Sequence, residues 1–548
     1  MDESFDKIDT FVIKDKKYRK QKNKKRIKFL LIFFLILVII GVIIFVVIKI
    51  ITKNYGYIIC VYQTNNDRET INLININDEN IEFILKIDEE EYKNKTSFKF
   101  SKAGNHTIKF IFKTKLKTLE NFFKEKESLI EADLSNLEAD EIKSLKRLFF
   151  RCKNLLKVKF DFKEANNIET MADLFKGCSS LNSTIFNFDT SNVIDIRGIF
   201  EGCKSLYNIN LNNFNTKNIK YMDYMFSKCS NLTSIDLSNF NFENVEDMSY
   251  MFQDCENLEK IIFPKSETNK LIYIPGMFRN CEKIKNIDLT YFRTNNVIEI
   301  NKLFYGCNNL EEIDFSKFNG ENINCFEEVF RNCYSLKNII NLSNLNLSKI
   351  NSLESAFERC YSLINIDLSF IESRLLERML YVFRNCNNLI EVKLPKNLFG
   401  IRYLNSIFEN CKKLENINLD QLYSNDNLIG TQKMFKNCEN LKNIKFPQIT
   451  ALQLENMSEM FYGCNKLESI DLEFFETRDI INMERMFYNC TMLKYLNIFN
   501  FRTKENVNSV DIFFNVISPI NINFTEKIRD KNLIQKFKDM NGNKSVIY

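Results

Sequence analysis

The sequence predicts an α/β solenoid: a curved stack of coils of about 26 residues, each with a short helix and a short parallel strand. One transmembrane helix and a small β domain precede the stack. Three observations lead to this fold class. Fourteen cysteines recur at steps of 25, 26 or 27 residues, a Phe lies three residues before each of them, and twenty consecutive residues near the N-terminus carry no charge.

The composition narrows both fold and function. Only 13 Gly and 5 Pro in 548 residues leave little room for long flexible linkers, and 51 Phe require a large core. The single histidine, His106, excludes multi-histidine metal sites and most histidine-based catalysis. We expect it beside a solvated turn at Gly104 and Asn105. Residues 1–28 carry a charge of +6 and the remainder −1, which argues against nucleic acid as a partner.

Residues 1–28 are predicted to form a basic cytoplasmic tail and residues 29–48 a transmembrane signal anchor. Twenty helical residues span about 30 Å, the thickness of the hydrocarbon core. Ten Lys and Arg residues lie between Lys14 and Lys28. The positive-inside rule therefore predicts a single-pass type II protein at the cell surface, with its C-terminal body outside. A cleaved signal peptide is the alternative, but its apolar region is normally shorter, about 7–15 residues.

The coil at residues 221–245 shows the repeat pattern. Apolar side chains at three- and four-residue steps, such as Met222 and Phe226, predict a short helix before the cysteine. The residue just before the cysteine is Gly or Asn in ten of fourteen coils, which is typical of a helix end. After the cysteine, Ile235 and Leu237 alternate with polar residues, which predicts a half-buried strand. Strands stack more closely than helices, so we expect strands inside the curve and helices outside.

The solenoid is predicted to span residues 116–524, with about fourteen full repeats and degenerate caps. The frame continues at Phe123 and Lys126 before the first column cysteine, and at Phe513 after the last one. Residues 525–548 are predicted to form a helical cap or tail. Residues 55–115 lack the repeat and contain four β-rich segments, which predicts a small β-sandwich-like domain.

The segments MFSKCSNLTSIDLSNF and MFYGCNKLESIDLEFF resemble the leucine-rich repeats of the BspA-like surface proteins. The resemblance covers about three quarters of the chain. It implies a curved leucine-rich-repeat stack displayed on a cell surface, in a family associated with adhesion to host or neighbouring surfaces. No single binding residue carries over from it. The membrane anchor agrees with surface display, although bacterial members use lipoprotein or cell-wall signals instead.

The column of fourteen cysteines permits disulfides, metal binding, redox sensing or simple burial. Equivalent cysteines of neighbouring coils lie one above another, near or beyond the limit for a disulfide, and no Cys-x-x-Cys pair points to zinc. We therefore expect buried free thiols. Cys60 and Cys325 lie off the column, and whether they pair stays open.

Two exposed rows of the predicted strands, five and seven residues after each cysteine, are the candidate recognition face. A calcium ladder would need six to eight oxygens at each site, and these rows are too interrupted. A solvated face is the plainer interpretation, but variable polar chemistry in a fixed frame is also what a recognition surface needs. The candidate residues are Asn210, Ser234, Asp236, Asn286, Asp288, Asp314, Asn365, Asp367, Asn416 and Asp471.

The predicted function is recognition or adhesion by a membrane-anchored surface protein that binds an extracellular protein or glycan. The alternative is a membrane-tethered intracellular scaffold that organises protein partners. Phosphate-binding loops, dinucleotide fingerprints and metalloprotease or EF-hand motifs do not occur in the sequence. We therefore predict neither enzymatic activity nor a catalytic, metal or cofactor site.

Overall fold

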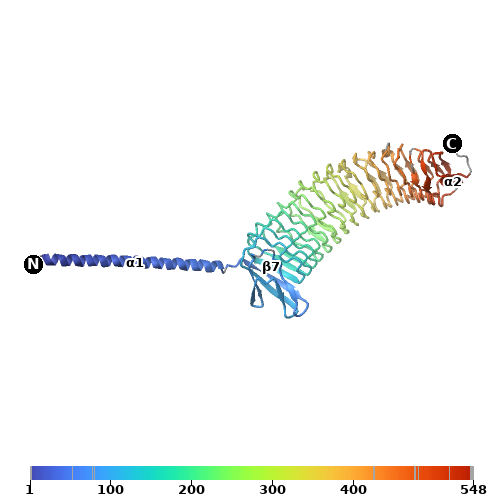
Figure 1. The fold of residues 1–548 in the computed structure, drawn as a ribbon. Helices are drawn as coiled ribbons and strands as arrows, with labels where there is room; N and C mark the ends of the chain where they lie inside the picture. Colours follow the sequence, from blue (N-terminus) through green and yellow to red (C-terminus); the bar gives the residue numbers. More distant parts are fainter. Residues whose placement is uncertain are drawn as a thin grey trace.

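The computed structural model describes residues 3–51, 53–76, 78, 80–423, 426–473, 475, 477–478, 480–517 and 519–542. Helix α1 (Glu3–Ile51) projects from one end of an arc-shaped stack of coils, and α2 (Lys531–Met540) lies at the other end (Figure 1). Residues 543–548 of the predicted C-terminal cap lie outside the described residues. The part of α2 that is described packs on the last coils, where its Phe537 contacts Phe513 and Phe524.

Helix α1 extends the predicted apolar segment through the basic tail. A span from Asp15 to Val47 has a mean hydropathy of 3.7 over its best window, and none of that window is buried against the protein. By length and composition, this helix is able to cross a membrane or to act as a signal sequence.

The segment before the repeats forms strands that join the solenoid. The four expected β-rich segments contain β1 (Gly56–Thr64), β2 (Thr70–Asn72), β3 (Phe83–Ile87) and β6 (Gly104–Phe112), and two short strands were not expected, β4 (Glu90–Lys93) and β5 (Ser97–Lys99). Strand β1 pairs on one side with β6 and on the other with β7 (Leu129–Leu137) of the first coil. One sheet in the order β4-β3-β6-β1-β7-β8-β9 therefore crosses the junction. Whether residues 55–115 are a separate domain stays a prediction.

The prediction of a solvated His106 is wrong. The residue lies within β6, half-buried, and its ring stacks on Phe100 at a centroid distance of 3.9 Å. Its Nε2 lies 2.9 Å from Thr64 Oγ1. The imidazole of His106 is therefore packed against an aromatic ring and lies beside a hydroxyl group, instead of being surrounded by solvent.

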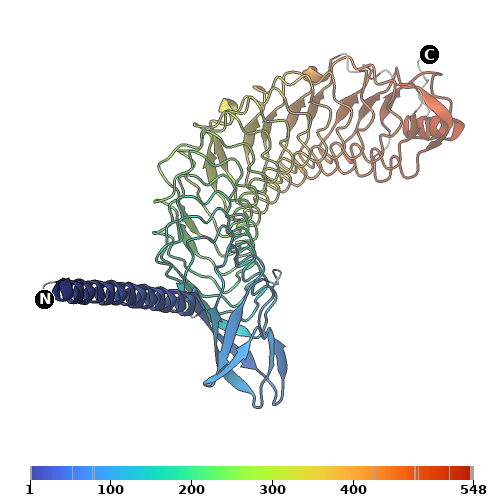
Figure 2. The same ribbon diagram turned by 60° about the vertical axis from the view of Figure 1, so that its left-hand side comes forward.

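The body is a β-solenoid with one short strand in most coils, and the coils are otherwise turns and loops (Figure 1, Figure 2). Two 3₁₀ turns interrupt it, η1 (Leu342–Asn344) and η2 (Asp420–Leu422). The remaining strands are β8 (Lys157–Phe160), β9 (Ser183–Phe186), β10 (Ser234–Asp236), β11 (Lys260–Ile262), β12 (Glu312–Asp314), β13 (Asn338–Ile340), β14 (Asn365–Asp367), β15 (Glu391–Lys393), β16 (Asn416–Asn418), β17 (Asn443–Lys445), β18 (Ser469–Asp471), β19 (Ile480–Asn482), β20 (Tyr495–Asn497), β21 (Thr503–Asn508) and β22 (Asn521–Asn523).

The prediction of a short helix in each coil is wrong: the segment before each cysteine is a series of tight turns. Two residues per coil, five and one before the cysteine, have positive φ, for example Tyr224 (57°) and Lys228 (61°). Between them, N–H groups bond alternately within the coil and to the next coil. Ser227 N–H donates to the Tyr224 carbonyl at 3.0 Å, and Phe226 N–H donates to the Met251 carbonyl at 2.9 Å. Turns of this kind place apolar residues at three- and four-residue steps as a helix does, so the pattern did not separate them.

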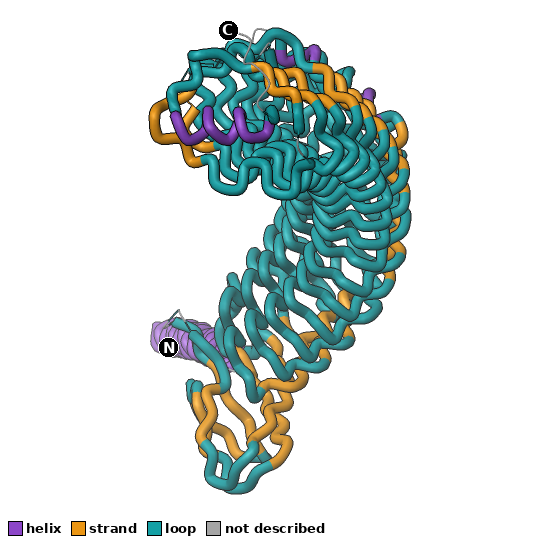
Figure 3. Tube along the Cα trace, turned by 90° about the vertical axis from the view of Figure 1, so that its right-hand side faces the viewer, coloured by secondary structure: helices purple, strands orange, loops and turns teal. Residues whose placement is uncertain are grey.

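The predicted direction of curvature is also wrong, because Figure 3 shows most of the strands along the outer edge of the arc, whereas β19 and β21 continue the column of turns. We call the column of turns the inner edge and the strand side the outer edge. Parallel bridges join the inner edge without a break from Ser144 to Cys325 and again from Ser352 to Asn482. The strands instead pair only in short groups, mostly of two. Continuous pairing holds the turns close together, and the broken ladder lets the coils fan apart on the strand side.

One aromatic stack runs through the core of the solenoid. Fifteen consecutive ring pairs from Phe123 to Phe513 have centroids 5.3–6.0 Å apart and interplanar angles of 2–13°. This is the offset geometry that aromatic rings prefer. The buried Leu and Ile residues after each cysteine lie in the same core cluster. No coil buries its apolar face by itself, so the stack is stabilised mainly by contacts between coils.

Candidate recognition surfaces

The cysteine column is structural, and the prediction of buried free thiols is confirmed. All sixteen cysteines are free, and all but Cys325 are buried. Each of the fourteen column thiols donates to the carbonyl oxygen of the Phe in the preceding coil, at 2.9–3.3 Å. The same carbonyl accepts the N–H of its own cysteine, for example Cys178 N–H to Phe175 at 2.9 Å. The thiol therefore occupies the second lone pair of a buried carbonyl.

Burial suppresses the reactivity of these thiols. Desolvation raises the pKa of Cys152 to about 12, and it raises the pKa of the deeper Cys178 and Cys281 well above the ordinary range. Because the thiolate is the nucleophile and the metal ligand, the column is inert at neutral pH. Cys325 is half-exposed, and burial also raises its pKa.

The ten predicted recognition residues are all exposed. Seven lie in strands β10, β12, β14, β16 and β18, and Asn210, Asn286 and Asp288 lie in coils without a strand. The seven residues in strands follow the outer edge of the arc rather than its inner surface, which corrects their predicted placement (Figure 3). Their role in recognition stays a prediction.

The carboxylates of this row also hold the chain turn that follows each strand. Asp236 Oδ1 accepts the Ser238 N–H at 2.9 Å, and Asp367 Oδ1 accepts the Ser369 N–H at 2.9 Å. Asparagine serves in the same way at Asn210. An Asx side chain that bonds the backbone two residues on is a common way to form such a turn. These side chains therefore already use part of their hydrogen-bonding capacity within the fold.

The row alternates in a way that the sequence analysis did not use. In four two-stranded ladders of the outer edge an Asp or Asn faces an Ile or Lys: Asp236 faces Ile262, Asp314 faces Ile340, Asp367 faces Lys393, and Asn418 faces Lys445. The residues that interrupted the candidate row thus mark the last strand of each ladder. The sequence shows this alternation at the residue where each return loop begins. That residue is Asp or Asn, followed by Leu or Phe, in one kind of coil, and Ile or Lys in the other.

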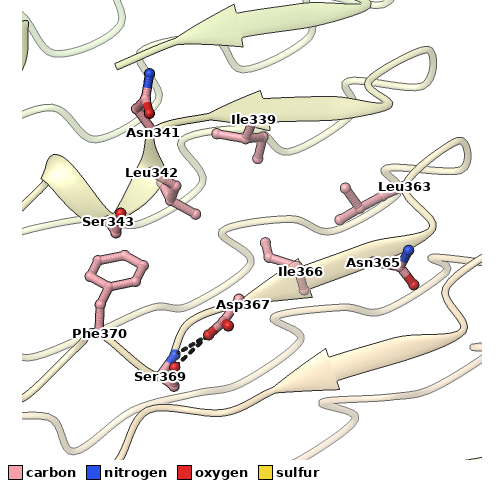
Figure 4. Close-up of a pocket in the computed structure, with 10 residues that line it drawn as sticks. All are labelled: Ile339, Asn341, Leu342, Ser343, Leu363, Asn365, Ile366, Asp367, Ser369 and Phe370. Atoms are coloured by element: carbon pink, nitrogen blue, oxygen red, sulfur yellow. Dashed lines mark hydrogen bonds between the residues drawn. The ribbon is translucent and has the colours of Figure 1, made fainter. Parts of the chain in front are cut away.

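A cleft of about 390 Å³ opens on the outer edge between β13 and β14 (Figure 4). Two of the predicted recognition residues, Asn365 and Asp367, line its rim. Leu342, Leu363 and Ile366 are buried and form an apolar floor. Sequence reasoning missed this cleft, because it depends on how two coils separate.

Aromatic side chains cluster on the inner edge. The rings of Tyr224 and Tyr250 stack with centroids 5.1 Å apart, and the guanidinium of Arg197 lies 4.7 Å from the ring centroid of Tyr221. Gly276 lies beneath Tyr250, where an added Cβ would fall 2.3 Å from the ring. Tyr and Arg of this kind are enriched in binding hot spots.

An acidic group lies beside these rings. Arg197 Nε bonds Asp195 Oδ1 at 2.9 Å, and the charges of Asp223 and Asp247 also act on this guanidinium. Burial and the neighbouring Asp247 raise the pKa of the Asp223 carboxyl to about 6. Within the described structure, the buried Oδ1 of Asp223 has no hydrogen-bond partner. One cation for three carboxylates leaves this part of the inner edge negative.

Residues 156–265, 272–394 and 402–527 match a family described as "Mycoplasma protein of unknown function, DUF285". The chain belongs to this family. The resemblance to the leucine-rich repeats of the BspA-like proteins stays a prediction. A comparison with curated proteins finds no match.

Comparison with solved structures finds distant likenesses, of low sequence identity and low TM-score. A leucine-rich repeat protein from Eubacterium ventriosum is 14% identical, with a TM-score of 0.31, over 62% of this chain and 78% of its own. A structure of the TLR13–ssRNA13 complex gives 17% identity and a TM-score of 0.21, over 72% of this chain and 64% of that one. A structure of the Drosophila Toll–Spatzle complex gives 14% and 0.21, over 69% and 53%.

The described residues offer little for metal chemistry. Within that part of the chain, groups of three or more His, Cys, Asp or Glu able to hold a metal ion do not occur. The candidate surfaces are the cleft and the Asx row on the outer edge, and the aromatic and acidic group on the inner edge.

Proposed function

We propose that this chain is a single-pass type II membrane protein whose solenoid lies outside the cell and recognises a protein or glycan on another surface. The observation that carries the proposal is the unbroken aromatic spine, which holds two long exposed edges of variable polar side chains at a fixed curvature. A preformed surface loses little conformational entropy on binding. Many weak contacts along one curve then add up to useful affinity.

The charge distribution around α1 supports the orientation. Lys22, Lys25, Arg26 and Lys28 lie just before the apolar stretch, and the first twenty residues after it hold only Lys49, Lys53 and Arg68. Such a bias favours a cytoplasmic N-terminus and an outward body. The same basic residues favour contact with anionic lipid headgroups on the cytoplasmic face.

Protease treatment of intact cells tests this function. We expect a C-terminal epitope tag to be lost and an N-terminal tag to survive until the membrane is permeabilised. Carbonate extraction should leave the full chain in the membrane pellet. If the solenoid resists external protease while the N-terminus is cleaved or also protected, surface recognition fails and the intracellular scaffold takes its place.

A further inference from the structure

The junction between the coils of Cys333 and Cys360 is open on its outer edge. The step between these cysteines is 27 residues, and Asn341 takes a left-handed conformation (φ 57°) before η1. Strands β13 and β14 are not paired, and most of their Cα atoms lie more than 8 Å apart. A strand inserted between them would need two ladder spacings, about 9.6 Å.

The inner edge of the same junction is held by backbone hydrogen bonds between the turns, although the ladder of bridges breaks there between Cys325 and Ser352. Phe330 N–H donates to the Ala356 carbonyl at 2.9 Å, as at other junctions. Glu358 is fully buried between two arginines, with Arg331 Nε 3.1 Å from Oε2 and Arg384 Nε 2.9 Å from Oε1. The two coils are therefore in contact at the inner edge and separated at the outer edge.

Backbone groups of both strands point into the gap. Phe315 N–H donates to the Ile340 carbonyl, so Ile340 faces β12. Successive residues of a parallel strand direct their N–H and C=O to opposite sides, so those of Ile339 face β14. By the same reasoning, Leu368 N–H bonds the Lys393 carbonyl, and the backbone of Asp367 faces β13. No backbone hydrogen bond joins β13 to β14 among the described residues.

The cleft between these strands has an apolar floor and a polar rim (Figure 4). Ile339 and Phe370 are half-buried beside the buried Leu363 and Ile366. The carboxylate of Asp367 is held by Ser369 and by Lys393 at 3.0 Å, so the rim carries little uncompensated charge. A guest strand alternates its side chains between floor and solvent.

We propose that this cleft binds an extended peptide segment of a partner protein as an inserted β-strand, hydrogen-bonded to Ile339 on one side and Asp367 on the other. The matching segment is about three residues long, as β13 and β14 are, and carries an aliphatic side chain for the floor between two polar ones. Strand addition of this kind takes its affinity from backbone bonds and its specificity from side-chain pockets. The inference names a partner chemistry for the recognition function proposed above and rests on it.

The test uses the full chain in nanodiscs and a fluorescein-labelled peptide with the sequence of residues 232–238 (LTSIDLS), which forms a three-residue strand in this solenoid. We expect saturable binding by fluorescence anisotropy. Methylation of the peptide's Ile and Asp backbone amides should weaken binding at least tenfold, because it removes the donors to both walls. Amide exchange at Ile339 and Asp367 should be fast in the free chain and slow in the complex.

Two matched variants locate the site. Ser343→Trp fills the cleft from its exposed rim and should weaken binding at least tenfold, whereas Ser238→Trp, in the turn after a closed ladder, should not. Equal thermal unfolding of both variants confirms their fold. Absence of binding, indifference to amide methylation, equal effects of the two variants, or slow exchange at Ile339 and Asp367 without peptide would each overturn the proposal. The assay uses purified protein, so it is independent of the cell-surface topology.

Discussion

Each column cysteine has a role that a small apolar residue does not fill. Its thiol donates to the carbonyl of the Phe one coil earlier, and that carbonyl already accepts one backbone N–H. The Phe-x-x-Cys frame is readable from sequence because every coil needs the same ring and the same donor. The reason why this position is a cysteine is not readable from sequence, because the carbonyl that accepts its thiol lies about 29 residues earlier in the chain.

Thiol labelling separates Cys325 from the column. It is the half-exposed cysteine, whereas the other fifteen are buried and burial raises their pKa. We expect a hydrophilic maleimide to label the native full chain once, and all sixteen sites after denaturation. Cys325→Ser should abolish the native labelling, and Cys281→Ser should leave it unchanged. Several labels on the native chain would contradict the buried column.

The charge on Asp223 should cost stability at neutral pH. Its pKa is about 6 in the folded chain against an ordinary value of 3.8, so the fold binds the proton more tightly than the unfolded chain does. Its contribution is therefore most favourable below about pH 4 and declines as the pH rises through 6. Asp223→Asn should raise the apparent Tm at pH 7.5 and have little effect at pH 4. An equal effect at both pH values would show that folding does not raise the pKa of this carboxyl. Asp236→Asn, in an exposed Asx turn, is the control.

The elements show where sequence reasoning succeeds and where it fails. The strand rows were predicted because two-residue alternation has few other causes. The turns resemble helices in sequence, because nothing at Tyr224, Tyr250 and Ser355 indicates that their φ is positive. The cleft is not predictable for a similar reason. In sequence, the extra residue after Cys333 shows only as one 27-residue interval between cysteines, and nothing indicates the left-handed conformation of Asn341.

Glu358 should hold the inner edge of the open junction. It is buried between two arginines on neighbouring coils; its removal would leave Arg384 without this counter-charge, while Arg331 would keep Glu328 at 3.0 Å. Glu358→Ala is expected to lower the free energy of unfolding by about 3 kcal/mol. Glu354→Ala, one turn away and half-exposed, should cost less than about 1 kcal/mol. Urea unfolding measures both, and similar losses would mean that the buried triad does not hold the junction.

The whole molecule takes its curvature from where pairing is continuous. The inner bridges run through nearly every coil, and the strand ladders stop after two or three strands. Strands would lie inside the curve if each coil held a helix, because helices need more room than strands. The coils hold tight turns instead, so the Asx row lies on the outer edge. Repeat number and core were predictable from local patterns, whereas curvature depends on small differences summed over many coils.

Spin-label distances along the two edges test this architecture most directly. In a Cys325→Ser background, one pair is Tyr221→Cys with Asn456→Cys on the inner edge, and the other is Ser234→Cys with Ser469→Cys on the outer edge. Both pairs are nine coils apart. The inner pair should lie about 43 Å apart, which is nine ladder spacings, and the outer pair distinctly farther. An outer distance equal to or shorter than the inner one would contradict an outward-facing strand edge and the open cleft it contains.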